Sequence, residues 1–333
     1  MKWFLLLTLS VCAEIPTFVL PTENDAVVQS RPNDFYMYVN RYFEGKDSKP
    51  WQAGTYGFVR NMKRTEAGVI GTRFHEGADI KPVRRNNYGV PLDPVVAVAE
   101  GVVAYVNGSS GGSNYGKYVV VRHNWGEGPI CSLYAHLGKV TCEEGQVVKA
   151  GDELGILGYT GAGIDKARAH LHFEVNLMLS ERFEKWHQLQ HGNSSGHGNY
   201  NGQNLVGLNS MELLSQQRLG NVTSLKSYLA KQRPYYSVTV PSQFTKALQK
   251  RYPWLWVAEQ GEHRTAEIAF SASGLPLTIK PSMRRVTSPT ITKLQPFLGR
   301  HEDRTIGRVS GSGQMGTLTE RGLLYLKLLC DQY

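Results

Sequence analysis

Short runs of apolar residues separated by glycine-bearing turns dominate the chain from about Phe58 to Leu177. Runs of this length, bounded by turn residues, are typical of β-strands. No stretch of this segment has the periodicity of a helix of normal length, so we expect a mostly β domain built from antiparallel hairpins. The clearest expected strands are Val95–Val98, Val102–Val106, Tyr118–Val121, Leu133–Leu137 and Leu171–Leu177.

The pattern changes on both sides of this segment. Residues 14–57 contain four prolines and few periodic runs, which predicts an extended lead-in. Residues 179–204 read as a glycine-rich connector that begins with a helix over Glu181–Leu189. Residues 205–333 are expected to form a smaller mixed α/β region of unknown role. Its expected elements are helices between Met211 and Arg233, with Asn221 as a cap, and strands at Tyr235–Val240 and Ala266–Ile279.

Residues 1–13 have the pattern of a short signal peptide. Lys2 gives a basic start, Trp3–Val11 is apolar, and Ala13 provides a small residue for cleavage. This apolar run is too short to span a bilayer, and no later segment is apolar enough to be a transmembrane helix. We therefore expect an exported protein, periplasmic or extracellular in the cell envelope.

Composition and net charge limit the kinds of binding partner to expect. The hydrophobic fraction of 41% indicates a globular chain, and 37 basic against 28 acidic residues give a net charge of +9. The basic residues are scattered and no nucleic-acid motif is present, so we expect no nucleic-acid partner. The charge predicts either plain solubility or attraction to an anionic polymer such as a bacterial envelope.

Cys131 and Cys142 could form a disulfide in an oxidising compartment, whereas the absence of C-x-x-C argues against zinc ligation by cysteine.

Two histidine motifs predict a metal site. His170 and His172 are two residues apart, so on a strand both side chains reach the same face. His75 and Asp79 are four apart and share a face on a strand or a helix; Gly77 between them favours the strand. Two histidines and one aspartate suit Zn²⁺ with a fourth position left to water, as in catalytic sites.

These motifs, with Tyr134–Ala135–His136–Leu137 and Glu174, resemble the lysostaphin/LytM-type zinc endopeptidases over residues 70–178. The resemblance implies a duplicated hybrid motif fold, an antiparallel β-sheet/barrel-sandwich hybrid, for the peptidase domain at 58–178. It implies that His75, Asp79 and His172 bind one Zn²⁺ per chain, and that His136 and His170 are an unligated catalytic pair. Either of this pair could be the base. The family hydrolyses peptide bonds in peptidoglycan, in stem peptides or cross-links, so peptidoglycan peptides are the expected partner.

Three further residues are candidates for contacts with the metal ligands or the substrate. Glu174 shares a face with His172 and could orient it. Arg73, two residues before His75, could pair with Asp79 or touch substrate. Tyr134 is two residues from His136, so its hydroxyl could donate to an oxyanion, or its ring could fill a hydrophobic wall. The polar loop Asn107–Tyr115 either rims the groove or is a plain turn.

Other functions compete with the secreted peptidase. One is a catalytically silent module that binds cell wall or regulates a hydrolase; such members of the family typically lose metal ligands, and this chain has lost none. A zinc peptidase with a protein substrate fits the same residues. A carrier domain of the biotin or lipoyl type fits the turn at 144–152, but no modifiable lysine stands at a hairpin tip. A second metal site in the loop of His191 and His197 is a weaker alternative. The oligomeric state does not follow from the sequence.

Overall fold

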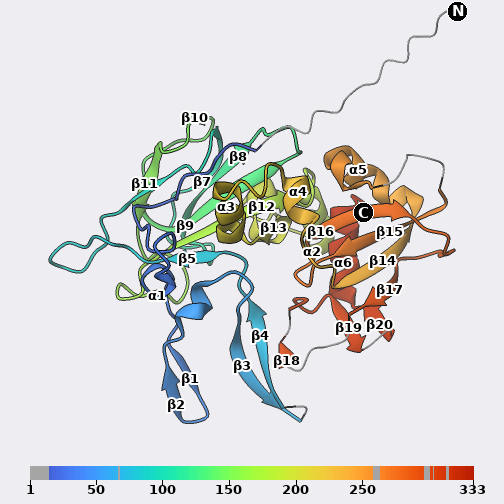
Figure 1. The fold of residues 1–333 in the computed structure, drawn as a ribbon, viewed down its shortest axis with the longest axis horizontal. Coiled ribbons are helices and arrows are strands. Elements are labelled where there is room, and N and C mark those ends of the chain that lie inside the picture. The colour runs from blue at the N-terminus through green and yellow to red at the C-terminus, as the bar shows by residue number, and fades with distance from the viewer. Residues whose placement is uncertain (1–14, 67, 258–262, 296–300, 303, 313–314) are drawn as a thin grey trace, which may run out of the picture.

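The computed structural model describes residues 15–66, 68–257, 263–295, 301–302, 304–312 and 315–333. The expected signal peptide at 1–13 lies outside these residues. Antiparallel β-sheets dominate the described chain, which confirms the predicted fold class. Figure 1 shows one large sheet, a smaller α/β region beside it, and two hairpins that project from the body. No helix within the described ranges is long and apolar enough to cross a membrane.

The large sheet has nine strands and runs in the order β10-β7-β8-β9-β11-β6, with β12 joined to β9, β5 and β13. All its pairings are antiparallel. Its strands are β5 (Ala78–Ile80), β6 (Pro94–Val96), β7 (Gly101–Asn107), β8 (Lys117–His123), β9 (Ile130–Val140), β10 (Val147–Val148), β11 (Glu153–Leu157), β12 (Leu171–Met178) and β13 (Leu205–Leu208). The five strands expected from apolar runs are therefore all present.

The central strands are buried on both faces. In β8, Val119 and Val121 point into the main hydrophobic core, whereas Tyr118 and Val120 point into a second cluster. Alternate residues of a strand face opposite sides, so a run that is apolar at every position indicates burial on both sides. Cys131 of β9 belongs to the second cluster. The sequence left open whether Cys131 and Cys142 form a disulfide; in the structure both are free thiols.

A bulge interrupts β9 at the point where it approaches the histidines. Val119 pairs with Tyr134, but Lys117 pairs with Leu137, so β9 carries one extra residue there. His136 has a φ of 64°, in the left-handed region. A bulge shifts the alternation by one residue. As a result Tyr134 and His136 face opposite sides, although they are two residues apart.

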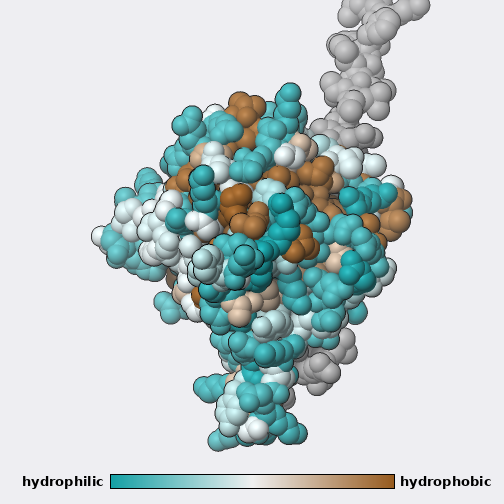
Figure 2. All heavy atoms as spheres, turned by 90° about the vertical axis from the view of Figure 1, so that its left-hand side faces the viewer, coloured by the Kyte–Doolittle hydropathy of each residue, from teal (hydrophilic) through white to brown (hydrophobic). Residues whose placement is uncertain are grey.

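The lead-in combines irregular chain with short elements. These are α1 (Pro32–Phe35), β1 (Arg41–Phe43), β2 (Lys46–Ser48) and the 3₁₀ turn η1 (Trp51–Gly54). Ile15, Phe18 and Phe35 are buried in the main core, so this segment packs on the large sheet. The hairpins β1–β2 and β3 (Val59–Thr65)–β4 (Gly68–Phe74) extend downward in Figure 1. The lower projection in Figure 2 is mostly hydrophilic, as expected of a hairpin in solvent.

The connector and C-terminal region are mixed α/β, as the sequence predicts. A four-stranded antiparallel sheet has the order β16-β15-β14-β17, and β18 pairs parallel with β4. The strands are β14 (Tyr236–Pro241), β15 (Thr265–Phe270), β16 (Pro276–Pro281), β17 (Thr290–Leu294), β18 (His301–Glu302), β19 (Val309–Ser312) and β20 (Met315–Leu318). The helices are α2 (Phe183–His191), α3 (Ser210–Arg218), α4 (Leu225–Leu229), α5 (Lys246–Arg251) and α6 (Glu320–Leu329), with 3₁₀ turns η2 (Gly198–Tyr200), η3 (Gly202–Asn204), η4 (Ser242–Thr245) and η5 (Pro253–Leu255).

Two details of this region differ from what the sequence predicts. Asn221 is not a helix cap, because Gly220 has a φ of 70° after α3 and Ser224 caps α4 through a capping box. Strand β13, which begins at residue 205, pairs with β12. The large sheet therefore continues past the boundary expected at residue 204.

The two parts share one hydrophobic core. Val121 and Leu177 of the large sheet belong to the same cluster as Val238 and Ile268 of the small sheet. Polar contacts join them as well: the buried Tyr252 hydroxyl lies 3.0 Å and 2.9 Å from the carbonyl oxygens of Pro129 and Met178. The α/β region is therefore packed firmly against the large sheet.

Candidate metal centre and its cleft

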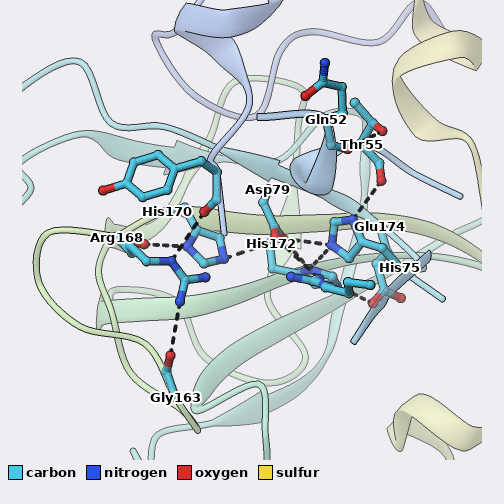
Figure 3. Close-up of polar contacts among 11 residues, drawn as sticks. Gln52, Thr55, His75, Asp79, Gly163, Arg168, His170, His172 and Glu174 are labelled. Carbon is cyan, nitrogen blue, oxygen red and sulfur yellow. Dashed lines mark hydrogen bonds and ion pairs between the residues drawn. The ribbon is translucent and has the colours of Figure 1, made fainter. Parts of the chain in front are cut away.

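Three expected metal ligands meet at the edge of the large sheet. His75 follows the end of β4, Asp79 lies in β5, and His172 lies opposite Asp79 on β12. Residues 75–77 form a link between strands, so the single extended strand expected over 75–79 is wrong. His75 Nε2 and His172 Nδ1 lie 3.0 Å and 2.8 Å from Asp79 Oδ1, and 3.3 Å from each other. Figure 3 shows the three side chains converging.

These distances fit one zinc ion. Ligands at about 2.0–2.1 Å from a tetrahedral ion are separated by about 3.3 Å. The three atoms meet this spacing within a few tenths of an ångström. Elsewhere in the described chain no three such side chains come this close, so His191 and His197 do not form a second centre of this kind.

The outer nitrogens of the two histidine ligands already have partners. His75 Nδ1 donates to the Thr55 carbonyl oxygen at 2.9 Å, and His172 Nε2 lies 2.7 Å from Glu174 Oε1. An acceptor on one ring nitrogen selects the tautomer whose other nitrogen offers a lone pair. The metal-facing nitrogen of each ring is therefore prepared to bind a cation.

His136 and His170 lie beside this group. Their ring centroids are 4.9 Å apart, and His170 Nε2 is 3.5 Å from Asp79 Oδ1. His136 Nδ1 donates to the Thr160 carbonyl oxygen at 2.9 Å, and His170 Nδ1 to that of Arg168 at 2.6 Å. Each ring thus keeps Nε2 as the nitrogen that can exchange a proton.

Burial and charge act in opposite directions on these groups. Burial lowers the pKa values of His75 and His136. Burial alone would raise the pKa of Asp79, but the charges on His75 and His170 hold it well below its usual range. Burial alone would lower the pKa of His172, but hydrogen bonds to Asp79 and Glu174 raise it to about 10.

Gly77 allows the link between His75 and Asp79 to cross β12 closely. A Cβ at this position would lie 2.7 Å from the Phe173 carbonyl oxygen and 2.9 Å from both Glu174 Cγ and His172 Cε1. These separations are shorter than van der Waals contact. The glycine is needed for space at the metal site.

A family comparison identifies the segment that carries these residues. The model of peptidase family M23 matches residues 73–183. A curated relative, "Lipoprotein NlpD" of Yersinia enterocolitica, is 33% identical over 82 residues, which are 25% of this chain and 75% of that protein.

The chain belongs to peptidase family M23.

Other relatives match a little over a third of the chain. An "Uncharacterized metalloprotease" of Haemophilus influenzae is 36% identical over 120 residues, 36% of this chain and 22% of that protein. "Murein hydrolase activator NlpD" of Salmonella typhimurium is 35% identical over 126 residues, 38% of this chain and 28% of that protein. The chain thus spans about a quarter of the length of these relatives. The catalytic domain of lysostaphin from Staphylococcus simulans is 20% identical, with a TM-score of 0.30 over 50% of this chain and 96% of that one.

Of the residues expected to contact the metal ligands or the substrate, some lie where the sequence predicts and others do not. Glu174 contacts His172, as described above. Arg73 lines the cleft but does not pair with Asp79; Arg60 on β3 lies 3.6 Å from Asp79 Oδ2 instead. Arg60 was missed because only the β3–β4 pairing places it opposite Arg73.

The oxyanion role considered for Tyr134 is wrong. Its hydroxyl accepts a hydrogen bond from the Val98 amide at 2.9 Å, and its ring packs against Phe173 in the main core. The bulge at His136 is the reason. Tyr115 is the tyrosine at the M23 site: its hydroxyl donates to Glu174 Oε1 at 2.9 Å. Residues 110–115 of the loop that contains it line the cleft, which is one of the two alternatives that the sequence left open.

The candidate metal ligands His75, Asp79 and His172 lie in a cleft of about 1510 Å³. Hairpins β1–β2 and β3–β4 contribute to one side, and the 110–115 and 161–164 loops to another. Residues of α6 in the C-terminal region also line it. This volume accommodates an extended peptide and not only a small molecule.

Proposed function

We propose that this chain is a zinc metalloendopeptidase that hydrolyses peptide bonds in bacterial peptidoglycan, in stem peptides or cross-links, outside the cytoplasm. The observation that carries this proposal is the group of five side chains at one cleft. Three of them have the spacing of metal ligands, and two histidines beside them are not needed as ligands.

Each residue has a distinct proposed role. His75, Asp79 and His172 hold the metal, and Glu174 orients His172 through Nε2. When bound, zinc supplies Lewis acidity, which polarises the scissile carbonyl and lowers the pKa of water. Burial lowers the pKa of His136, which favours a neutral imidazole that can accept a proton at neutral pH. Of His136 and His170, one takes the proton from the attacking water and the other donates to the oxyanion or the leaving amine.

The relatives support a role at the cell wall and also supply the main alternative. Several are named murein hydrolase activators or NlpD lipoproteins. An activator module could bind wall or a partner hydrolase without any metal chemistry. We favour the peptidase because an activator has no need of three ligands with their outer nitrogens fixed and two further histidines beside them.

The test is digestion of purified sacculi, followed by mass analysis of the released fragments. Wild-type protein loaded with zinc should release peptides with a new amino end. His172→Ala should lose both zinc and hydrolysis, whereas His136→Ala should retain zinc, measured by elemental analysis, and lose hydrolysis. His187→Ala, at a partly exposed histidine on α2 that does not line the cleft, is the matched control and should behave as wild type.

Three results would contradict the proposal. If both His172→Ala and His136→Ala retained full activity, the roles assigned to these two residues would be wrong. A zinc-loaded wild type that leaves sacculi intact but stimulates a separate wall hydrolase would favour the activator. Cleavage of an unrelated protein such as casein, with sacculi untouched, would favour a protein substrate.

A further inference from the structure

The C-terminal region forms part of the wall of the metal cleft. Arg321, Leu324 and Leu328 of α6 line it. These positions are three and four residues apart, so they lie on one face of the helix. The family match covers only residues 73–183, and none of this wall lies within it.

This wall is held firmly against the peptidase domain. Strand β18 extends the β3–β4 hairpin by pairing with β4. Tyr56 precedes β3, and its hydroxyl lies 3.1 Å from Ser273 Oγ of the C-terminal region. Arg308 stacks its guanidinium 3.8 Å from the centre of the Tyr325 ring, and the Tyr325 hydroxyl donates to the Gly274 carbonyl oxygen at 2.7 Å. A substrate in the cleft therefore meets a preformed surface.

The cleft carries more positively than negatively charged side chains. Apart from its histidines, the basic side chains among the described residues that line it are all arginines, and the only carboxylates there are Glu76 and Asp79. The arginines are Arg41, Arg60, Arg73, Arg168, Arg308 and Arg321. Arginine presents a planar fork of donors that matches a carboxylate in two contacts, which a lysine cannot do.

Two of these arginines directly face each other across a hairpin. Arg60 and Arg73 are cross-strand partners on β3–β4, and both line the cleft. Like charges at such positions destabilise a sheet unless an anion lies nearby. Asp79 lies near Arg60 at 3.6 Å, but the buried Arg60 Nε has no hydrogen-bond partner. Arg73 is exposed to the cleft. Burial raises the pKa of Glu76 and the charge on Arg73 opposes this, so Glu76 is one anion near Arg73. Because Arg73 nevertheless stays exposed, the pair can also receive an anionic group from outside the chain.

We propose that the cleft between the β3–β4 hairpin and α6 is a carboxylate subsite, with Arg73 on one wall and Arg321 on the other. It holds a free carboxylate of the peptide beyond the scissile bond, so the C-terminal region is part of the substrate-binding site. This inference rests on the proposed function in that the ligand is the peptide substrate.

The test compares one peptide in two charge states. Stem peptides isolated from sacculi are used as such and after conversion of their carboxylates to amides. Wild type should prefer the carboxylate form. Arg321→Gln and Arg73→Gln should each raise KM for that form about 10-fold, the loss of a charge-assisted hydrogen bond, with kcat and the amidated peptide little affected. Arg285→Gln, an exposed arginine outside the cleft, is the control.

A binding measurement separates this inference from the proposed function. Fluorescence anisotropy of labelled peptides reports affinity whether or not hydrolysis occurs, and thermal unfolding and zinc content verify that each variant is folded. If wild type cleaves nothing but both variants lose affinity for the carboxylate form alone, the subsite stands and the peptidase assignment fails. Equal affinity of wild type for both forms, or equal losses on both forms in the variants, would overturn the subsite.

Discussion

At the residue scale, hydrogen bonds to ring nitrogens organise the metal centre. All four histidines around it place one ring nitrogen on an oxygen: three on backbone carbonyls and His172 on the Glu174 carboxylate. The backbone partners cannot be removed by substitution. Glu174 can, which makes it the residue where the contribution of these contacts is measurable.

Glu174→Gln should weaken zinc binding about 10-fold, because the amide is a poorer acceptor for the His172 Nε2 proton. A zinc competition titration with a chromophoric chelator measures this change. Tyr115→Phe is the matched control: it removes another hydrogen bond to the same carboxylate and should change zinc affinity much less. Unchanged affinity in Glu174→Gln would show that the carboxylate does not assist His172.

His123 should make stability depend on pH. Burial lowers the pKa of His123 to about 4, against about 6.5 in an unfolded chain. The unfolded state therefore binds more protons between these values, so the free energy of unfolding falls as pH drops from about 6.5 towards 4. The full loss is about 3 kcal/mol.

Chemical denaturation of wild type and His123→Gln at pH 7, 5.5 and 4.5 measures this effect. The variant is expected to be less stable at pH 7, because it loses the contacts to the Glu100 carbonyl oxygen and Ser132 Oγ. Its stability should, however, fall less steeply with pH. Parallel curves for the two proteins would argue against a titrating His123.

At the element scale, close crossing of backbone segments positions the ligands. The link at 75–77 joins β4 to β5 and crosses β12 at Gly77. Gly77→Ala should displace either this link or His172, so zinc affinity and thermal stability should both fall, by at least 1 kcal/mol in unfolding free energy. Gly108→Ala is the matched control, since a Cβ there meets nothing within 4 Å.

Calorimetric unfolding of both variants with and without zinc provides the measurement. Zinc should raise the melting temperature of Gly108→Ala as much as that of wild type. It should raise that of Gly77→Ala by less. An equal zinc-dependent increase in both variants would show that the crossing tolerates a methyl group without disturbing the ligands.

The sequence predicted some elements well and others poorly, for a physical reason. Apolar runs such as Tyr118–Val121 identify strands because burial on both faces requires apolar residues at each position. Strict alternation failed at His136, because a bulge depends on how β8 and β9 pair and not on local composition. The same limit explains Arg60, whose place near Asp79 follows only from the pairing of β3 with β4.

At the scale of the whole molecule, the shared core predicts cooperative unfolding. Tyr252 is fully buried, and its hydroxyl contacts two carbonyl oxygens of the large sheet. Tyr252→Phe should lower the free energy of unfolding by about 1–2 kcal/mol, because buried acceptors lose their donor. Tyr88→Phe, at a residue that is 80% exposed, should have no effect.

Hydrogen exchange followed by mass spectrometry tests whether the loss is shared. Protection in β8–β9 and in β14–β15 should decrease together in Tyr252→Phe, because one core joins both sheets. A decrease confined to β14–β15 would mean that the C-terminal region opens by itself. In that event its wall of the cleft would be movable and not preformed.

The sequence alone determined which residues form the candidate metal site. His75, Asp79, His136, His170 and His172 are recognisable by residue type and spacing, since metal binding depends on donor atoms that only a few side chains carry. The tertiary structure decided which partners surround them: Arg60, Tyr115 and the α6 wall come from segments far from the motifs in the chain. Such contacts arise from strand pairing and packing, which bring distant residues together without leaving a local pattern.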